Sequence, residues 1–77
     1  MSRYHWVMTI QVWPEPATVI TTYREGTVRP DAGQTRGQVF SYLYERTLAL
    51  AAADPRLRGV SLDNPVVTFF SLEPDEL

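Results

Sequence analysis

The 77-residue chain has no cysteine, no lysine, one histidine and no long apolar run. The lack of cysteine excludes disulfide bonds and thiolate metal sites, and a single histidine makes a zinc site improbable. No apolar stretch approaches the roughly 20 residues that cross a bilayer, and the N-terminus lacks the apolar core of a signal peptide. The sequence therefore predicts a cytoplasmic protein without a metal, a cofactor or a membrane partner.

The basic residues are all arginine, seven in number, and the formal net charge is −2. This acidic balance weighs against non-specific nucleic-acid binding, which depends on many cationic contacts to phosphate. Arginine without lysine, together with frequent alanine, valine and proline, is typical of a GC-rich genome. We therefore expect a bacterial protein, for example from an actinobacterium or its phage.

Size limits the core. Residues 1–77 are expected to form a single small domain, and a chain of this length buries only about 60–65% of the surface that its unfolded form exposes. Domains of this size often gain stability from a disulfide, a metal or a partner. Because the first two are not expected here, association with another subunit or protein is the remaining route.

Residues 3–13 show strict alternation, the strongest local signal in the chain. The apolar side chains on one face of the predicted strand are Tyr4, Trp6, Met8, Ile10 and Val12. Pro14 and Pro16 end it, because proline cannot donate a ladder hydrogen bond. Residues 17–25 are rich in threonine, valine and isoleucine and predict the second strand of an antiparallel hairpin. We expect a bulge at Gly26 to reset its alternation.

A helix is predicted from about Thr35 to Ala53. Thr35 and Gln38 have the spacing of a capping box, and the Asp54-Pro55 pair ends the helix. Its predicted apolar stripe comprises Val39, Phe40, Leu43, Thr47, Leu50 and Ala51.

The last strand is predicted over residues 66–72, after a surface connection at 54–65, and residues 72–77 are expected to be a frayed acidic tail. The order β-β-α-β predicts a two-layer α+β domain in which one helix packs on a three-stranded, mostly antiparallel sheet. The most apolar strand, residues 3–13, is expected in the centre, which gives strand order 2-1-3.

One helix covers one sheet face, so the other face is expected to be open. Alternation assigns six apolar or aromatic residues to this uncovered side and makes them the candidate partner-binding residues: His5, Val7, Trp13, Ile20, Val67 and Phe69. The set is large enough to form a patch at the upper end of what soluble monomers expose.

Catalytic chemistry has little support in the sequence. His5 could act as a base with Asp63 or Glu73, but a half-exposed strand residue is the simpler interpretation. Residues 33–37 precede a helix and could hold an anion, yet they lack the lysine and glycine spacing of a phosphate loop. We therefore expect no enzyme and no catalytic or cofactor-binding residues.

Two functions remain. The first is a protein-interaction module that forms a homodimer or binds another protein through its open sheet face. The second is a small nucleic-acid-binding or regulatory protein of phage or mobile-element origin. In the second case, bases would stack on the aromatic side chains while Arg3, Arg24 and Arg29 hold phosphates.

Overall fold

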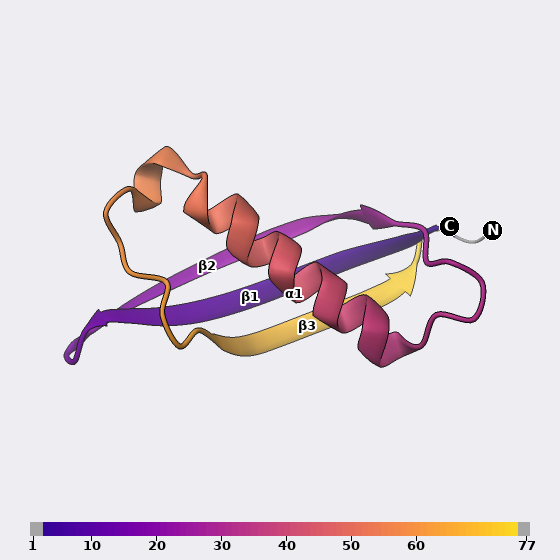
Figure 1. The fold of residues 1–77 in the computed structure, drawn as a ribbon, viewed down its shortest axis with the longest axis horizontal. Helices are drawn as coiled ribbons and strands as arrows, with labels where there is room; N and C mark the ends of the chain where they lie inside the picture. Colours follow the sequence, from indigo (N-terminus) through magenta and orange to yellow (C-terminus); the bar gives the residue numbers. More distant parts are fainter. Residues whose placement is uncertain (1–2, 76–77) are drawn as a thin grey trace.

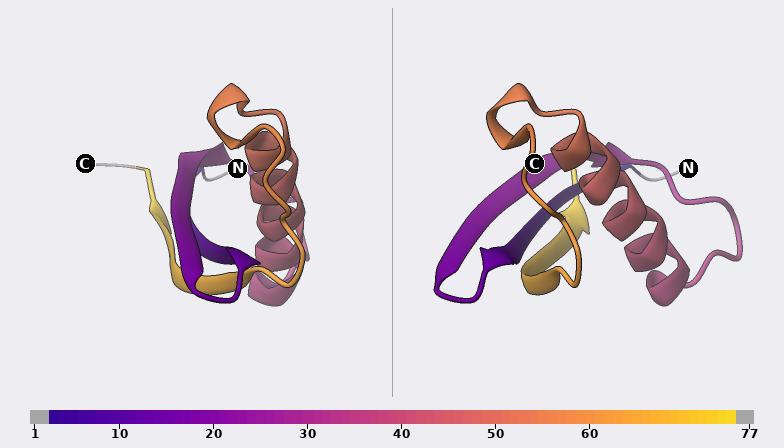
Figure 2. Two further views of the ribbon diagram at one scale, coloured as in Figure 1. Left: turned by 90° about the vertical axis from the view of Figure 1, so that its left-hand side faces the viewer. Right: turned by 60° about the vertical axis from the view of Figure 1, so that its left-hand side comes forward.

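A computed structural model describes residues 3–75 and confirms the two-layer α+β fold (Figure 1). Three strands, β1 (Tyr4–Glu15), β2 (Thr18–Val28) and β3 (Val66–Pro74), form one antiparallel sheet in the order β2-β1-β3. The helix α1 (Arg36–Ala52) lies across one face, and a short 3-10 helix, η1 (Pro55–Leu57), begins the connection to β3. The open face predicted from the sequence is present: Figure 2 shows the helix and the loops on one side of the sheet only.

β1 is the central strand, and its alternating side chains bury one face beneath the helix while the other face is flanked by both neighbouring strands. Trp6, Met8, Ile10 and Val12 point toward the helix and are buried. The intervening residues point to the open face and are half-buried by their neighbours on both sides. Strand order therefore follows from burying the most apolar face of the chain beneath α1.

The helix begins and ends close to its predicted bounds. Thr35 is the N-cap, and the capping box is complete: the Thr35 hydroxyl accepts from the Gln38 amide at 3.1 Å, and the Gln38 side chain accepts from the Thr35 amide at 2.8 Å. The buried stripe repeats every four residues at Val39, Leu43, Thr47 and Ala51.

Leu50 was wrongly included in this stripe. It is exposed, and Leu48 packs against the core in its place. The stripe drifts in this way because the helix crosses the sheet obliquely, so its contact line follows the i, i+4 positions.

Aromatic side chains fix the N-terminal half of the helix to β3. The Phe40 ring meets the Phe70 ring edge to face, with centroids 4.9 Å apart, and stacks on Tyr44 at 6.4 Å. Such pairs contribute beyond the area they bury. They hold the helix over the β3 side of the sheet at this end, as Figure 1 shows.

An ion pair fixes the other end of the helix to β2. Asp54 follows α1 and caps η1, and its Oδ2 accepts from the Arg24 Nη2 at 2.8 Å on the helix-covered side of the sheet. Arg56 of η1, whose side chain is largely exposed, donates to the same carboxylate at 2.8 Å. These hydrogen bonds from the Arg56 side chain and amide, with the charge of Arg24, lower the pKa of Asp54 to about 2.

A bulge in β3 corrects one predicted position. Thr9 pairs with Phe69 but Ile10 pairs with Val67, so Thr68 is an extra residue that reverses the alternation upstream of it. Val67 therefore packs against the core under the helix, whereas the sequence pattern placed it on the open face. Val66 takes that place, opposite Gln11, and is 47% exposed.

Ile20 is a second correction, with a different cause. It pairs with Val12 and so lies on the helix-covered face. No bulge occurs at Gly26, because the register of β2 with β1 is unbroken from Ile20 to Val28. Gly26 instead lies opposite Trp6, and a Cβ atom at this position would lie 3.3 Å from the indole Nε1.

The predicted frayed tail is also corrected over its described part. Leu72 faces Trp6, and Pro74 still pairs with Tyr4. Beyond the strand, the Asp75 amide donates to the Arg3 carbonyl at 2.9 Å, and the two side chains form an ion pair at 2.9 Å. Residues 76 and 77 of the predicted tail lie outside the described part of the chain.

The molecule is elongated and exposes much surface for its mass. Its extents are 43 × 21 × 18 Å, and its radius of gyration is 13.7 Å. A compact domain of this length would have a radius of about 11.5 Å. The accessible surface is 5458 Å², whereas monomers of this mass expose about 4,800 Å².

Replacing Val67 and Val66 by alanine tests the bulge. Val67→Ala removes methyl groups that pack under the helix and should lower the free energy of unfolding by about 1 kcal/mol. Val66→Ala, the matched control one residue away, should change it by less than about 0.5 kcal/mol. Urea denaturation of both variants measures the difference. The reverse ranking would show that the alternation is unbroken and that Val67 faces the solvent.

Acid titration tests the Asp54 ion pair. The carboxyl has a folded pKa of about 2 against an ordinary value of 3.8, so the unfolded chain binds the proton more readily. Its stabilising contribution should be complete above about pH 4 and disappear as the pH falls toward about 2. Asp54→Asn keeps a capping side chain but lacks the charge. Urea denaturation should therefore show the stability difference between the two proteins shrinking over this interval. A difference that stays constant with pH would exclude the ion pair as its cause.

Candidate functional site

The open sheet face is an ordered set of side chains in rows across the three strands. Each row has its central residue on β1 and one neighbour on each edge strand. From one end of the sheet to the other, the rows are Thr27–His5–Glu73, Glu25–Val7–Ser71, Tyr23–Thr9–Phe69 and Thr21–Gln11–Val66. Alternation adds Val19 and Trp13 at the hairpin end.

Exposed apolar side chains gather in one half of this face. Seven large hydrophobic side chains are exposed within residues 3–75, and five of them lie here. We call these five the apolar group: Trp13, Val19, Tyr23, Val66 and Phe69. Tyr23 and Phe69 are the most exposed, at 58% and 54%. They flank the short Thr9 side chain in a single row.

The opposite half of the face is polar and acidic. His5 lies directly across from Glu73, and its Nε2 is 3.7 Å from the Glu25 Oε1. His5 therefore has carboxylates on both sides, one of them the Glu73 that the sequence analysis considered. In the part of the chain that the structure describes, no three metal-ligating side chains come together. The open face thus has an apolar end and an anionic end.

The sequence predicted the open face but identified only some of the residues that lie on it. His5, Val7, Trp13 and Phe69 lie on it as predicted, whereas Ile20 and Val67 lie beneath the helix. Sequence reasoning missed Val19, Tyr23 and Val66. Val19 and Tyr23 share one alternation phase in β2, so knowing the β1–β2 register would have identified them. Val66 had no comparable signal, because the bulge that turns it outward leaves no distinctive residue.

The arginines proposed to hold phosphates do not surround the open face. Arg24 lies on the helix-covered side of the sheet, where it binds Asp54, and Arg3 is paired with Asp75. Arg29 lines a groove on the helix side. The charged neighbours of the apolar group on this face are instead glutamates. This arrangement does not favour the binding of a phosphate backbone.

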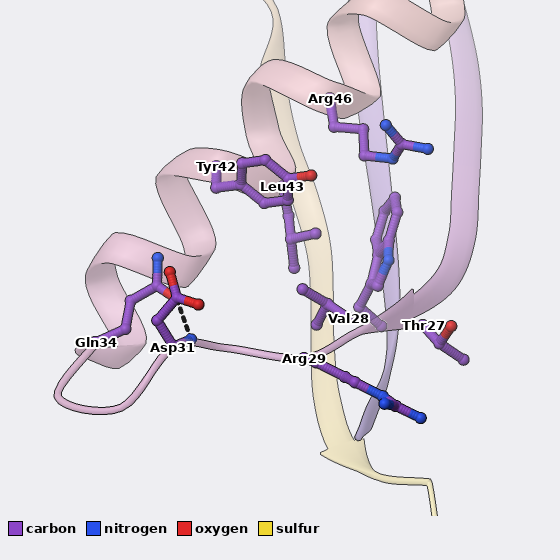
Figure 3. Close-up of a pocket in the computed structure, with 9 residues that line it drawn as sticks. Thr27, Val28, Arg29, Asp31, Gln34, Tyr42, Leu43 and Arg46 are labelled. Atoms are coloured by element: carbon purple, nitrogen blue, oxygen red, sulfur yellow. Dashed lines mark hydrogen bonds between the residues drawn. The ribbon is translucent and has the colours of Figure 1, made fainter. Parts of the chain in front are cut away.

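A groove of about 490 Å³ lies between α1 and the end of β2 (Figure 3). Its lining includes Tyr42 and Arg46 from the helix and Arg29 and Asp31 from the loop between β2 and α1. Figure 3 shows the two arginine side chains at opposite ends of the groove, so their charges do not converge on one position. The groove therefore lacks the geometry of an anion site.

At the start of the helix, backbone amides are hydrogen-bonded to side chains of the same segment. The capping box uses the Thr35 and Gln38 amides, of which the Thr35 amide belongs to residues 33–37, the segment where an anion could bind. The Gln34 side chain also takes part in a hydrogen bond, since it accepts from the Asp31 amide at 3.0 Å.

No helix within residues 3–75 is long and apolar enough to cross a membrane. The open face remains as the candidate site.

Comparison with known proteins adds no assignment. No protein-family model, curated protein or solved structure matches this chain. Its function is therefore argued from the chemistry of the open face.

Proposed function

We propose that this protein is a non-enzymatic interaction module, which self-associates or binds another protein through its open sheet face. The observation that carries the proposal is the apolar group, five exposed apolar side chains gathered on one face. Aromatic side chains of this kind are enriched at the centres of protein interfaces. On composition, we place the protein in the cytoplasm of a bacterium with a GC-rich genome.

The size of the apolar group supports this proposal. An aromatic side chain presents about 150–250 Å², and those of the apolar group are about half exposed. With the two valines, the group amounts to roughly 400–500 Å², in the range of the largest patches on soluble monomers. Covering it would contribute free energy that the small core under α1 lacks.

Substitution of the two adjacent phenylalanines tests the proposal. Phe69→Glu places a charge in the apolar group and should weaken association at least tenfold while the thermal transition stays within a few degrees of wild type. Phe70→Ala removes a partly buried ring that packs on Phe40 beside the core, and should lower the thermal transition much more than Phe69→Glu does. Sedimentation velocity from about 1 to 200 µM and thermal circular dichroism measure the two effects.

Tyr42→Glu is the matched control. Tyr42 is also an exposed aromatic residue, at 50%, but it lies on the helix. This variant should associate like wild type. Unfolding of the Phe69→Glu protein would instead show that Phe69 belongs to the core. Equal weakening by both glutamate variants would point to a non-specific charge effect and contradict the proposal.

Nucleic-acid binding is the alternative and remains a prediction with weaker support. It predicts that a single-stranded oligonucleotide quenches Trp13 fluorescence and that added salt reverses the quenching. Self-association through the apolar group should weaken little with salt, because the charges near it are alike in sign. Titration of wild type and Trp13→Phe at low and high salt separates the two functions.

A further inference from the structure

We propose that the groove between α1 and the end of β2 binds a small linear dianion, a molecule with a carboxylate at each end and an apolar body between them. Arg29 and Arg46 each hold one carboxylate, and the Trp6 indole N–H donates a hydrogen bond to the same ligand. The groove lies on the helix side of the sheet, so this site is separate from the open face and does not depend on the function proposed for that face.

Both arginine side chains of the groove are free to meet a ligand. Within residues 3–75, the arginines that form ion pairs with carboxylates are Arg3, Arg24 and Arg56. Arg29 and Arg46 form none with the described residues, and both line the groove. Their charges are therefore not used to hold the fold together.

Asp31 is the acidic residue in the lining, and it does not neutralise either arginine. Its backbone amide donates to the Gln34 side chain at 3.0 Å. Figure 3 shows the Asp31 carboxylate on this side of the groove, apart from both guanidinium groups. Each end of the groove thus keeps an uncompensated cation.

The separation of the two arginines decides the class of ligand. Because they lie at opposite ends of the groove, one small anion cannot reach both. A molecule with an anionic group at each end can. A guanidinium group binds a carboxylate through two parallel hydrogen bonds, so each end of such a ligand meets a donor of matching geometry.

The floor of the groove suits an apolar body between the two carboxylates. It includes Trp6 and Leu43, which are 2% and 0% exposed, and the side chain of Val28 beside them. The volume of about 490 Å³ is within the range of pockets that hold small molecules.

The Trp6 indole N–H is a buried donor without an acceptor of its own. Its Nε1 forms no hydrogen bond within residues 3–75. In this part of the chain, Thr47 Oγ1 is the one polar side-chain atom that is both closed to solvent and unpaired, so the Trp6 Nε1 remains accessible from the groove. Gly26, the β2 residue beside this nitrogen, has no side chain that could accept from it. Because buried indole N–H groups usually have a partner, this donor points to a ligand with an acceptor.

Titration with dicarboxylates of graded length tests the site. Trp13→Phe, a change on the open face, leaves Trp6 as the one tryptophan of the chain, so fluorescence then reports on the groove. The probes are the linear dicarboxylates from succinate to suberate, with hexanoate as the monocarboxylate, each up to about 10 mM at low salt. We expect one or more of the dicarboxylates to bind at least about tenfold more tightly than hexanoate, because only they meet both arginines.

Three charge-removing variants separate this site from general attraction of anions. Arg29→Gln and Arg46→Gln should each lower the affinity for the best dicarboxylate to about that for hexanoate. Arg58→Gln, the matched control, removes the same charge from the connection after η1, outside the groove, and should bind like the parent protein. Circular dichroism checks that all three are folded. If no dicarboxylate binds more tightly than hexanoate, or if Arg58→Gln weakens binding as much as the groove variants do, the proposal is overturned.

The Trp6 indole N–H provides a second measurement. In a proton–nitrogen NMR spectrum of the isotope-labelled Trp13→Phe protein, the single indole signal is that of Trp6. The best dicarboxylate should shift this signal and saturate it with the dissociation constant found by fluorescence. An indole signal that does not move while the ligand binds would show that the ligand lies elsewhere, and would overturn the assignment to this groove.

Discussion

A single helix can cover only one face of a three-stranded sheet, and this constraint determines most features of the molecule. Four side chains of β1, Trp6, Met8, Ile10 and Val12, are buried beneath α1, so the core is small but well defined. The opposite side of the same strand has no layer above it. The exposed aromatic side chains of the open face follow from this imbalance, because apolar surface without a covering layer stays in contact with water.

The position of the helix depends on two different interactions, one near each end. Close to its start, Phe40 packs on Phe70 of β3. Just beyond its end, Asp54 binds Arg24 of β2. The helix therefore crosses the sheet diagonally, from β3 toward β2, as Figure 1 shows. Because Arg24 pairs with Met8, its side chain lies on the helix-covered face, and this cation helps to hold the fold together.

Local sequence patterns predicted the elements well, and their errors have identifiable physical causes. Strand alternation assigns a side chain to a face only while the register is regular. One inserted residue, Thr68, reverses the phase and exchanges Val66 with Val67. For Ile20, the pattern of β2 gave no inward face, and the face was decided by pairing with Val12. The position of Gly26 in the sequence suggested a bulge, but in the structure its lack of a side chain leaves room for the Trp6 indole.

The sequence by itself determined the three strands, the capped helix, the central place of β1 and the existence of an uncovered face. These depend on local periodicity, capping chemistry and the number of elements, all of which can be read along the chain. The tertiary structure alone decided which side chains share that face. Tyr23, Thr9 and Phe69 come from three strands, and only their pairing register brings them into one row. Register is a long-range property, set by how the strands fit together under the helix, and no local pattern in the chain encodes it.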